Sequence, residues 1–358
     1  MRGARGEGWG EGWRDGRARR ALFVVVKIGV SAGLLWLLFS QTDVGAVGAR
    51  LRGMEVGWLL LSAAIYLLHL LVGAWRWRLL LGTQRIGVPV WTLFRSYLVA
   101  TFFNNFLPSN IGGDVIRIAD TAPLTGSRTV ATGVILVDRV IGLVALTAVA
   151  ALGSVLAHHG RMPVPGAAYL WMVLVGFVAV GVPALYHPQL VTKMLGPLRV
   201  LHPEWVEHRL ARIHTLLEQM GQRPGALVVA GAGSVIVQVL LVLVYVALAH
   251  GLGISFRVRD AFIIVPVSLV AQLLPISING LGVREALFSY FFARLGLGVG
   301  AALALSLASA GLIMILSLVG GVLFLLRRRS QPATERAELH DGRHRRLLDA
   351  TDDLDIDT

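Results

Sequence analysis

The chain is dominated by long apolar stretches that alternate with short polar connections. Six of these stretches are about 20 residues long, the length that crosses a hydrocarbon layer of roughly 30 Å at 1.5 Å per helical residue. They cover residues 21–39, 57–74, 130–157, 167–186, 226–249 and 300–326. The pattern predicts an all-α polytopic membrane protein with six full transmembrane helices.

Two further apolar segments are shorter and are interrupted by proline, glycine and polar residues. The first spans 91–107, and the second spans 261–278 and resumes at 286–292. Backbone groups at such an interruption lack helical partners, and they are tolerated at membrane depth only inside protein or beside a polar cavity. We therefore predict two re-entrant segments of broken helix, near 91–127 and 261–295.

Polar segments flank and interrupt this apolar region. Residues 1–20 carry six arginines, which is typical of a disordered basic arm, and residues 329–358 end in an acidic run and are predicted to be a disordered tail. The transmembrane domain then covers 21–328. Within it, the hydrophilic segment 187–225 contains an amphipathic stretch and is predicted to lie on the cytoplasmic membrane surface.

The two broken segments resemble each other. Each has an amide residue three positions before a proline, then a glycine five positions, an aliphatic residue eight positions and an arginine nine positions after that proline. The matched pairs are Asn105 and Gln272, Pro108 and Pro275, Gly113 and Gly280, Ile116 and Val283, and Arg117 and Arg284. Three full spans lie between the copies, so two re-entrant copies enter from opposite faces. The pattern predicts an inverted repeat, the architecture of many transporters.

Composition excludes the soluble classes. Hydrophobic residues make up 55% of the chain and charged residues 15%, against about 25% charged residues in a typical soluble domain. Lysine and arginine number 33 against 21 acidic residues, a formal charge of +12. Because the arginines lie between apolar blocks, they indicate topology and contact with anionic lipid rather than with nucleic acid. The chain has no cysteine, which excludes disulfides and thiolate metal sites.

The distribution of basic residues predicts the orientation in a cell membrane. With both broken segments re-entrant and the N-terminus inside, 24 basic residues fall on the inner side, Arg76, Arg78 and Arg85 among them, and 7 on the outer side. With both segments as full spans, the split would be 20 and 11. The positive-inside rule favours the first arrangement, with both termini cytoplasmic.

Charged residues at membrane depth are the candidate functional residues. Asp138 and Arg139 lie in the middle third of one apolar block, where each costs roughly 2.5–3.5 kcal/mol on insertion scales. We expect both to face a cavity, with Asp138 paired to Arg117 or Arg284 and Arg139 holding a head-group phosphate. The alternative is a buried pair that only fixes helix packing.

Helix N-termini at the two breaks would also attract anions. Asp114 and Arg117 share a helix face, and Asn279 precedes Arg284 and Glu285. The predicted lipid head-group residues are Arg117, Arg284, Arg139, Asn105, Asn110 and Asn279, and their predicted charge partners are Asp114, Asp138 and Glu285. For the glycines and prolines, the alternative is a role in caps and tight turns.

The sequence shows no signature of a cofactor or metal site. It contains no Walker sequence and no dinucleotide loop in a strand–helix context, and no recognisable catalytic motif. We therefore predict no cofactor and no metal, and an enzyme is the less favoured class. An intramembrane enzyme with Asp114, Asp138 or Glu285 as acid or base stays open as the alternative.

The motifs FNNFLPSNIGGDVIR at 103–117 and LPISINGLGVREA at 274–286 resemble the lysylphosphatidylglycerol synthase transmembrane region family, also described as flippase-like. The resemblance covers about residues 20–328. It implies a relation to the membrane half of multiple-peptide-resistance-factor proteins, which is associated with moving aminoacylated phospholipid across the bilayer. Only 32 residues follow Leu326, so we expect no soluble aminoacyltransferase domain and no synthase activity.

These observations lead to one functional hypothesis and two rivals. We expect a lipid translocase that binds phospholipid or polyprenyl-type head groups in an arginine-lined intramembrane cavity. Its expected partners are membrane lipids, either anionic, aminoacylated or polyprenyl-linked, and not nucleic acid. The rivals are the intramembrane enzyme acting on a lipid carrier and a non-transporting partner of a lipid-modifying enzyme.

Overall fold

The computed structural model describes residues 42–106, 112–159, 167–197, 203–272 and 282–329, together with residues 29, 32–33, 36–38 and 40. The regular elements within these ranges are helices. They are α2 (Val44–Arg52), α3 (Val56–Thr83), α4 (Val90–Phe106), α5 (Gly112–Thr125), α6 (Arg128–His159), α7 (Ala167–Tyr186), α8 (Pro188–Leu195), α9 (Pro203–Gly221), α10 (Pro224–Gly251), α11 (Val258–Ala271), α12 (Val283–Arg294) and α13 (Val299–Arg329). The predicted arm 1–20 and most of the predicted tail lie outside the described residues.

Four of the described helices are long and apolar enough to cross a membrane: α3, α6, α10 and α13. A shorter apolar stretch, Ala167–Gly181, lies in α7. These five helices coincide with five of the six predicted apolar blocks, and most of the block 21–39 lies outside the described residues. The protein is an all-α polytopic membrane protein, as its hydrophobic pattern predicts.

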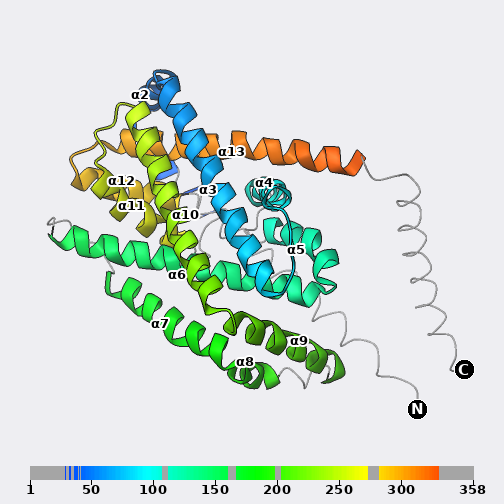
Figure 1. Ribbon diagram of the computed structural model, residues 1–358. Helices are drawn as coiled ribbons and strands as arrows, with labels where there is room; N and C mark the ends of the chain where they lie inside the picture. Colours follow the sequence, from blue (N-terminus) through cyan, green and yellow to red (C-terminus); the bar gives the residue numbers. More distant parts are fainter. Residues whose placement is uncertain are drawn as a thin grey trace, which may run out of the picture.

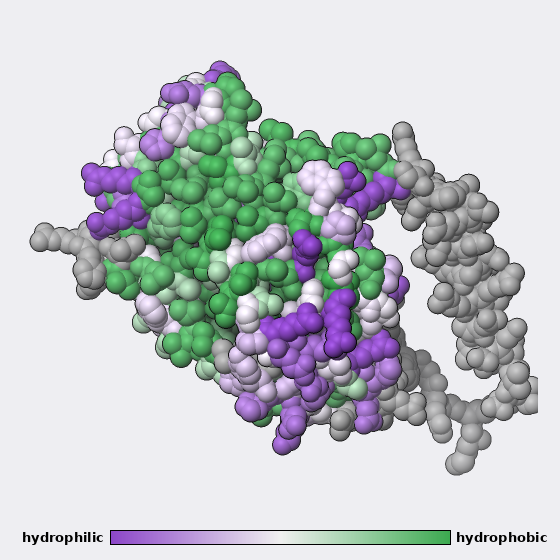
Figure 2. Space-filling view, viewed as in Figure 1, coloured by the Kyte–Doolittle hydropathy of each residue, from purple (hydrophilic) through white to green (hydrophobic). Residues whose placement is uncertain are grey.

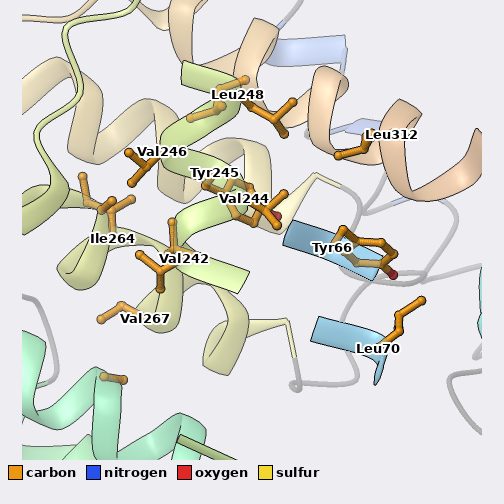
Figure 3. Close-up of a cluster of buried hydrophobic side chains, with 14 of the residues drawn as sticks. Tyr66, Leu70, Val242, Val244, Tyr245, Val246, Leu248, Ile264, Val267 and Leu312 are labelled. Atoms are coloured by element: carbon orange, nitrogen blue, oxygen red, sulfur yellow. The ribbon is translucent and has the colours of Figure 1, made fainter. Parts of the chain in front are cut away.

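The long helices cross one another around a shared core. α3 runs alongside α10, α13 packs on α4, and α6 contacts both α10 and α11 (Figure 1). Side chains from α3, α10, α11 and α13 meet in the interior, where Tyr66, Tyr245, Ile264 and Leu312 are buried together (Figure 3). The outer surface over α3 and α10 is hydrophobic, whereas hydrophilic residues gather over α9 and the neighbouring end of the bundle (Figure 2). This division fits a bundle that is surrounded by lipid and meets water at its ends.

Each predicted broken segment is a pair of short helices. α4 and α5 form the first helix pair, and α11 and α12 form the second. The two helices within each pair contact each other. The breaks at 107–111 and 273–281, with Pro108 and Pro275, lie outside the described residues. The structure thus confirms helices on both sides of each interruption, while the re-entrant path stays a prediction.

Glycine permits the closest contact of each helix pair with a long helix. A Cβ atom on Gly320 of α13 would lie 2.0 Å from the backbone oxygen of Leu98 in α4, and one on Gly153 of α6 would lie 2.5 Å from that of Phe262 in α11. Small residues of this kind let membrane helices approach backbone to backbone. The first helix of each pair therefore packs on the long helix that follows the other pair.

The segment 187–225 forms α8 and α9, which lie against the bundle. The apolar face of α9, with Leu210, Leu216 and Met220, is buried, and α9 contacts both α6 and α7. Gln84, at the end of α3, donates a hydrogen bond from Nε2 to the Leu216 carbonyl over 3.3 Å. The amphipathic stretch is helical, and its apolar face packs on protein.

Candidate functional site

The centre of the site is the carboxylate of Asp138, which binds two arginines. Arg76 donates from Nε to Oδ1 over 2.7 Å, and Arg117 donates from Nη2 to Oδ2 over 2.9 Å. Asp138 lies within α6 and is 1% exposed. The structure thus places Asp138 against Arg117, one of the two partners that the sequence predicts for it, and adds a second arginine from α3.

The position of Arg76 corrects the sequence analysis, which counted this residue among the basic residues of a connection on the inner side of the membrane. α3 continues nine residues past the predicted block and carries Arg76 in its interior, where it is 4% exposed. Its Nη1 also donates to Ser234 Oγ of α10 over 2.8 Å. Arg76 is buried because Asp138 and Ser234 offer it acceptors on two neighbouring helices. The signal in the sequence is the apolar run Leu79–Leu81, which carries the helix past the arginine.

Aromatic rings contact the guanidinium group of Arg117, and carboxylates contact its nitrogen atoms. Its guanidinium carbon lies 4.2 Å from the ring centre of Trp77 and 4.7 Å from that of Tyr97, distances typical of cation–π contacts. Asp114, one turn earlier on α5, approaches Arg117 Nη1 to 3.8 Å. Side chains of α3, α4 and α6 therefore fix the position of this arginine.

Asp114 links the buried pair to a more accessible arginine. It accepts a hydrogen bond from Arg139 Nε, so the first turn of α5 is tied to α6. The Arg139 side chain is 41% exposed, whereas those of Arg76 and Arg117 are both 5% exposed. Arg139 is thus the open edge of the site.

These five side chains form one connected group, which we call the central ion-pair network. Its members are Arg76, Asp114, Arg117, Asp138 and Arg139. Three guanidinium groups face two carboxylates, so the network has a formal charge of +1. The more exposed Arg139 is one of the three arginines, so an anion can reach the excess charge at the edge of the network. The arrangement can therefore hold a monovalent anion.

Asn104, near the end of α4, joins the two helices of the first pair. Gly113 donates its backbone N–H to Asn104 Oδ1 over 2.8 Å, a contact that the sequence analysis did not foresee. The predicted residue, its neighbour Asn105, has a buried Nδ2 with no hydrogen-bond partner in the part of the chain that the structure describes. The predicted residues Asn110 and Asn279 lie outside the described residues.

The second helix pair has a smaller polar group of its own. Arg284 Nη2 lies 2.8 Å from Glu285 Oε1, and Ser306 Oγ of α13 contacts both of them, at 2.8 Å from Arg284 Nε and 2.6 Å from Glu285 Oε1. Glu285 Oε2 also accepts the backbone N–H of Gly282 over 2.7 Å, which caps the start of α12. Arg284 thus has a carboxylate partner other than Asp138, and this group is electrically neutral.

The comparison with known protein families covers most of the chain. A family model described as "Lysylphosphatidylglycerol synthase TM region" matches residues 24–321, which contain both helix pairs and the central ion-pair network. No curated protein and no solved structure matches the chain.

Proposed function

Because the chain belongs to the lysylphosphatidylglycerol synthase TM region family, we propose that it is a lipid translocase that binds an anionic lipid head group at the central ion-pair network. The protein is a membrane protein of a family whose name refers to a modified phospholipid. Within the proposal, the head-group phosphate contacts the network while the acyl chains stay in the bilayer. The membrane is the cell membrane, with both termini cytoplasmic.

The formal charge of +1 on the central ion-pair network carries the proposal. A phosphodiester has one negative charge at neutral pH, so its binding would neutralise the five side chains as a group. Arginine binds phosphate through two parallel N–H donors, and such charge-assisted bonds are among the strongest in proteins. Arg139 offers the accessible guanidinium for this contact, since its side chain is 41% exposed.

The other members of the network position Arg139. Asp138 neutralises Arg76 and holds Arg117 against Trp77, and Arg117 in turn lies beside Asp114, the carboxylate that contacts Arg139. Arg117 acts in this proposal mainly as a positioning residue. Asn105, whose buried amide nitrogen has no partner among the described residues, is a second polar contact for the head group. The proposal keeps Arg284, Asn110 and Asn279 as further contacts on the path of the lipid.

An inverted repeat would give this site alternating access, and the spacing of equivalent residues supports the duplication. Gly153 and Gly320, which make the close contacts of α6 and α13, are 167 residues apart. Arg117 and Arg284 have the same separation. The helix contacts are also reciprocal, since α4 packs on α13 and α11 packs on α6, while α3 and α10 pack on each other. Two such halves can rock about a shared site in transporters.

Reconstitution in liposomes tests the proposal. We expect the wild-type chain to move fluorescently labelled phosphatidylglycerol between leaflets without any change in lipid mass. Arg139→Gln removes the accessible charge but keeps hydrogen-bond donors toward Asp114, so we expect about a tenfold slower exchange with a preserved fold. Arg128→Gln, which removes an exposed arginine at the start of the same helix, is the matched control and leaves exchange unchanged.

Two results would contradict the translocase. Equal exchange rates for the wild type and Arg139→Gln would show that the network takes no part in transport. A change in lipid mass that requires Asp114, Asp138 or Glu285 would instead favour the intramembrane enzyme. In that case, mass spectrometry of the lipids from the same liposomes identifies the product.

A further inference from the structure

A second polar site lies one helical turn of α5 from the central ion-pair network, between α4, α5 and α13. It is a pocket of about 280 Å³, and its polar lining includes Arg95, Ser96, Asp120, Thr121 and Arg327. A water molecule takes up about 30 Å³ of liquid, so the pocket has room for a phosphate group and its first substituent. The lining comes from three helices that also carry or contact the first helix pair.

The charges of this pocket leave one arginine in excess. Arg327 donates from Nη1 to Asp120 Oδ2 over 2.8 Å, so that pair is neutral. Arg95 adds a further positive charge, and its guanidinium carbon lies 5.4 Å from the ring centre of Trp91. The three ionised groups therefore sum to a formal charge of +1, which favours an anion.

A buried hydroxyl in the lining supplies an independent sign of a ligand. Ser96 is 2% exposed, and its Oγ has no hydrogen-bond partner among the residues that the structure describes. A buried hydroxyl without a partner is uncommon in folded proteins and is unfavourable by about 1–3 kcal/mol. A phosphate oxygen in the pocket would accept this hydroxyl hydrogen.

The surroundings of the pocket fit a lipid. Trp91, next to Arg95, is 56% exposed at the start of α4, and tryptophan is enriched where a membrane meets water. Arg327 is near the end of α13, beyond the apolar part of that helix. Leu124, which also lines the pocket, is exposed and can contact an acyl chain. The pocket thus combines the charge, the depth and the apolar edge that a lipid head group needs.

We propose that this pocket binds the phosphate of an anionic glycerophospholipid, held by Arg95 and Arg327 with Ser96 as a hydroxyl donor. The site is distinct from the central ion-pair network and binds lipid whether or not the protein transports it. It lies close to that network, however, because Thr121 of the pocket donates its hydroxyl to the Arg117 carbonyl over 2.7 Å. One helical turn of α5 therefore separates the two sites.

Lipid binding to the purified full chain tests the site. The probe is dioleoylphosphatidylglycerol, titrated into the delipidated protein in detergent and followed by native mass spectrometry, with the zwitterionic dioleoylphosphatidylcholine as reference. All variants carry Arg139→Gln, so that binding at the central ion-pair network does not contribute and a failure of the translocase proposal does not affect the result. Thermal unfolding of each variant checks that the fold is kept.

Substitutions at Arg95 and Asp120 are expected to change the lipid affinity in opposite directions. Arg95→Gln removes one basic group, which is worth about 1 kcal/mol near a membrane surface, so we expect about fivefold weaker binding of phosphatidylglycerol. Asp120→Asn removes the opposing charge and frees Arg327, so we expect severalfold tighter binding. Arg78→Gln, at an exposed arginine of α3 outside the pocket, is the matched control and leaves the affinity unchanged.

Three outcomes would overturn the assignment. Equal affinities of Arg95→Gln and Arg78→Gln would show that the pocket does not hold the lipid. Weaker binding by Asp120→Asn with an unchanged melting temperature would contradict the charge argument. Competition by millimolar inorganic phosphate as effective as that by the lipid would identify a site for free phosphate instead.

Discussion

The two helix pairs place an arginine at equivalent positions and surround it differently. Arg117 of the first pair contacts Asp138 of α6 and stacks on Trp77 of α3, so side chains of two other helices hold it. Arg284 of the second pair contacts its neighbour Glu285 and Ser306 of α13. The first arginine is part of a network across the bundle, and the second is part of a local group.

The difference is sharpest on the long helix that follows each pair. Arg139 of α6 and Ser306 of α13 are 167 residues apart, the separation of Arg117 and Arg284, and each contacts the carboxylate of its own pair. The first half therefore has a cation where the second half has a hydroxyl. The first network has three arginines and two carboxylates, a formal charge of +1, whereas Arg284 and Glu285 of the second group balance each other. The comparison teaches that a shared arrangement of helices can carry different chemistry in its two halves.

The largest expected effect on stability distinguishes Asp138 of the first half from Glu285 of the second half. Asp138→Asn removes the charge that neutralises two buried arginines on different helices, and breaking such a buried pair typically costs about 3–5 kcal/mol. Glu285→Gln should cost less, about 1.5–3 kcal/mol, because only one arginine loses its counter-charge and the amide oxygen can still accept from either Gly282 or Ser306. Unfolding of the purified variants in SDS, followed by tryptophan fluorescence, measures both free energies.

The order of these two costs is the informative result. A larger loss for Glu285→Gln would mean that the local group of the second pair is the main polar support of the bundle. Asp138→Glu keeps the charge and changes only the length of the side chain. It should therefore recover part of the stability that Asp138→Asn loses.

The second prediction concerns the two glycines that make equivalent close contacts in the two halves. Gly153→Ala and Gly320→Ala would each place a methyl group against the backbone of the opposite helix pair, where no side chain can move aside. We expect each to destabilise the protein by about 2–3 kcal/mol, within the range for overpacked interiors. Gly176→Ala in α7 has open space at this position and is the control, neutral or slightly stabilising.

Equal losses at Gly153 and Gly320 would support equivalent roles in a duplicated fold. If only one of the two alanine variants were destabilised, the reciprocal packing of α6 and α13 would not be a shared feature of the halves. Measurement of the unfolding free energy in the same detergent decides between these outcomes.

The local hydrophobic pattern of the sequence predicts most of the helices but only some of the contacts in the site. Unbroken apolar runs predict α6 as 130–157 and α10 as 226–249, within two residues of the observed helices at each end. Arg76 was misplaced because the hydropathy of the run falls at Trp75–Arg78, while its burial depends on Asp138, 62 residues away. A linear pattern has no access to that contact.

The hydroxyl contacts were missed for a related reason. Serine is common in membrane helices and often bonds to its own backbone, as Ser154 does here with the Ala151 carbonyl. Nothing in the local sequence distinguishes Ser234 and Ser306, which bind arginines of other helices. The charged residues, by contrast, were conspicuous at membrane depth because burial of a charge requires a partner.

The smallest expected effect tests these two hydroxyls. Ser306→Ala removes two contacts at once, the acceptor for Arg284 Nε and the donor to Glu285, and should cost about 1.5–2 kcal/mol. Ser234→Ala removes only one contact to a charged group, since Arg76 keeps its bond to Asp138, and should cost about 1 kcal/mol. The unfolding free energies of the two variants give this order directly. The reverse order would mean that Ser234 supports Arg76 more strongly than Ser306 supports Arg284 and Glu285. The contrast between a network centred on Asp138 and a local group that depends on Ser306 would then fail.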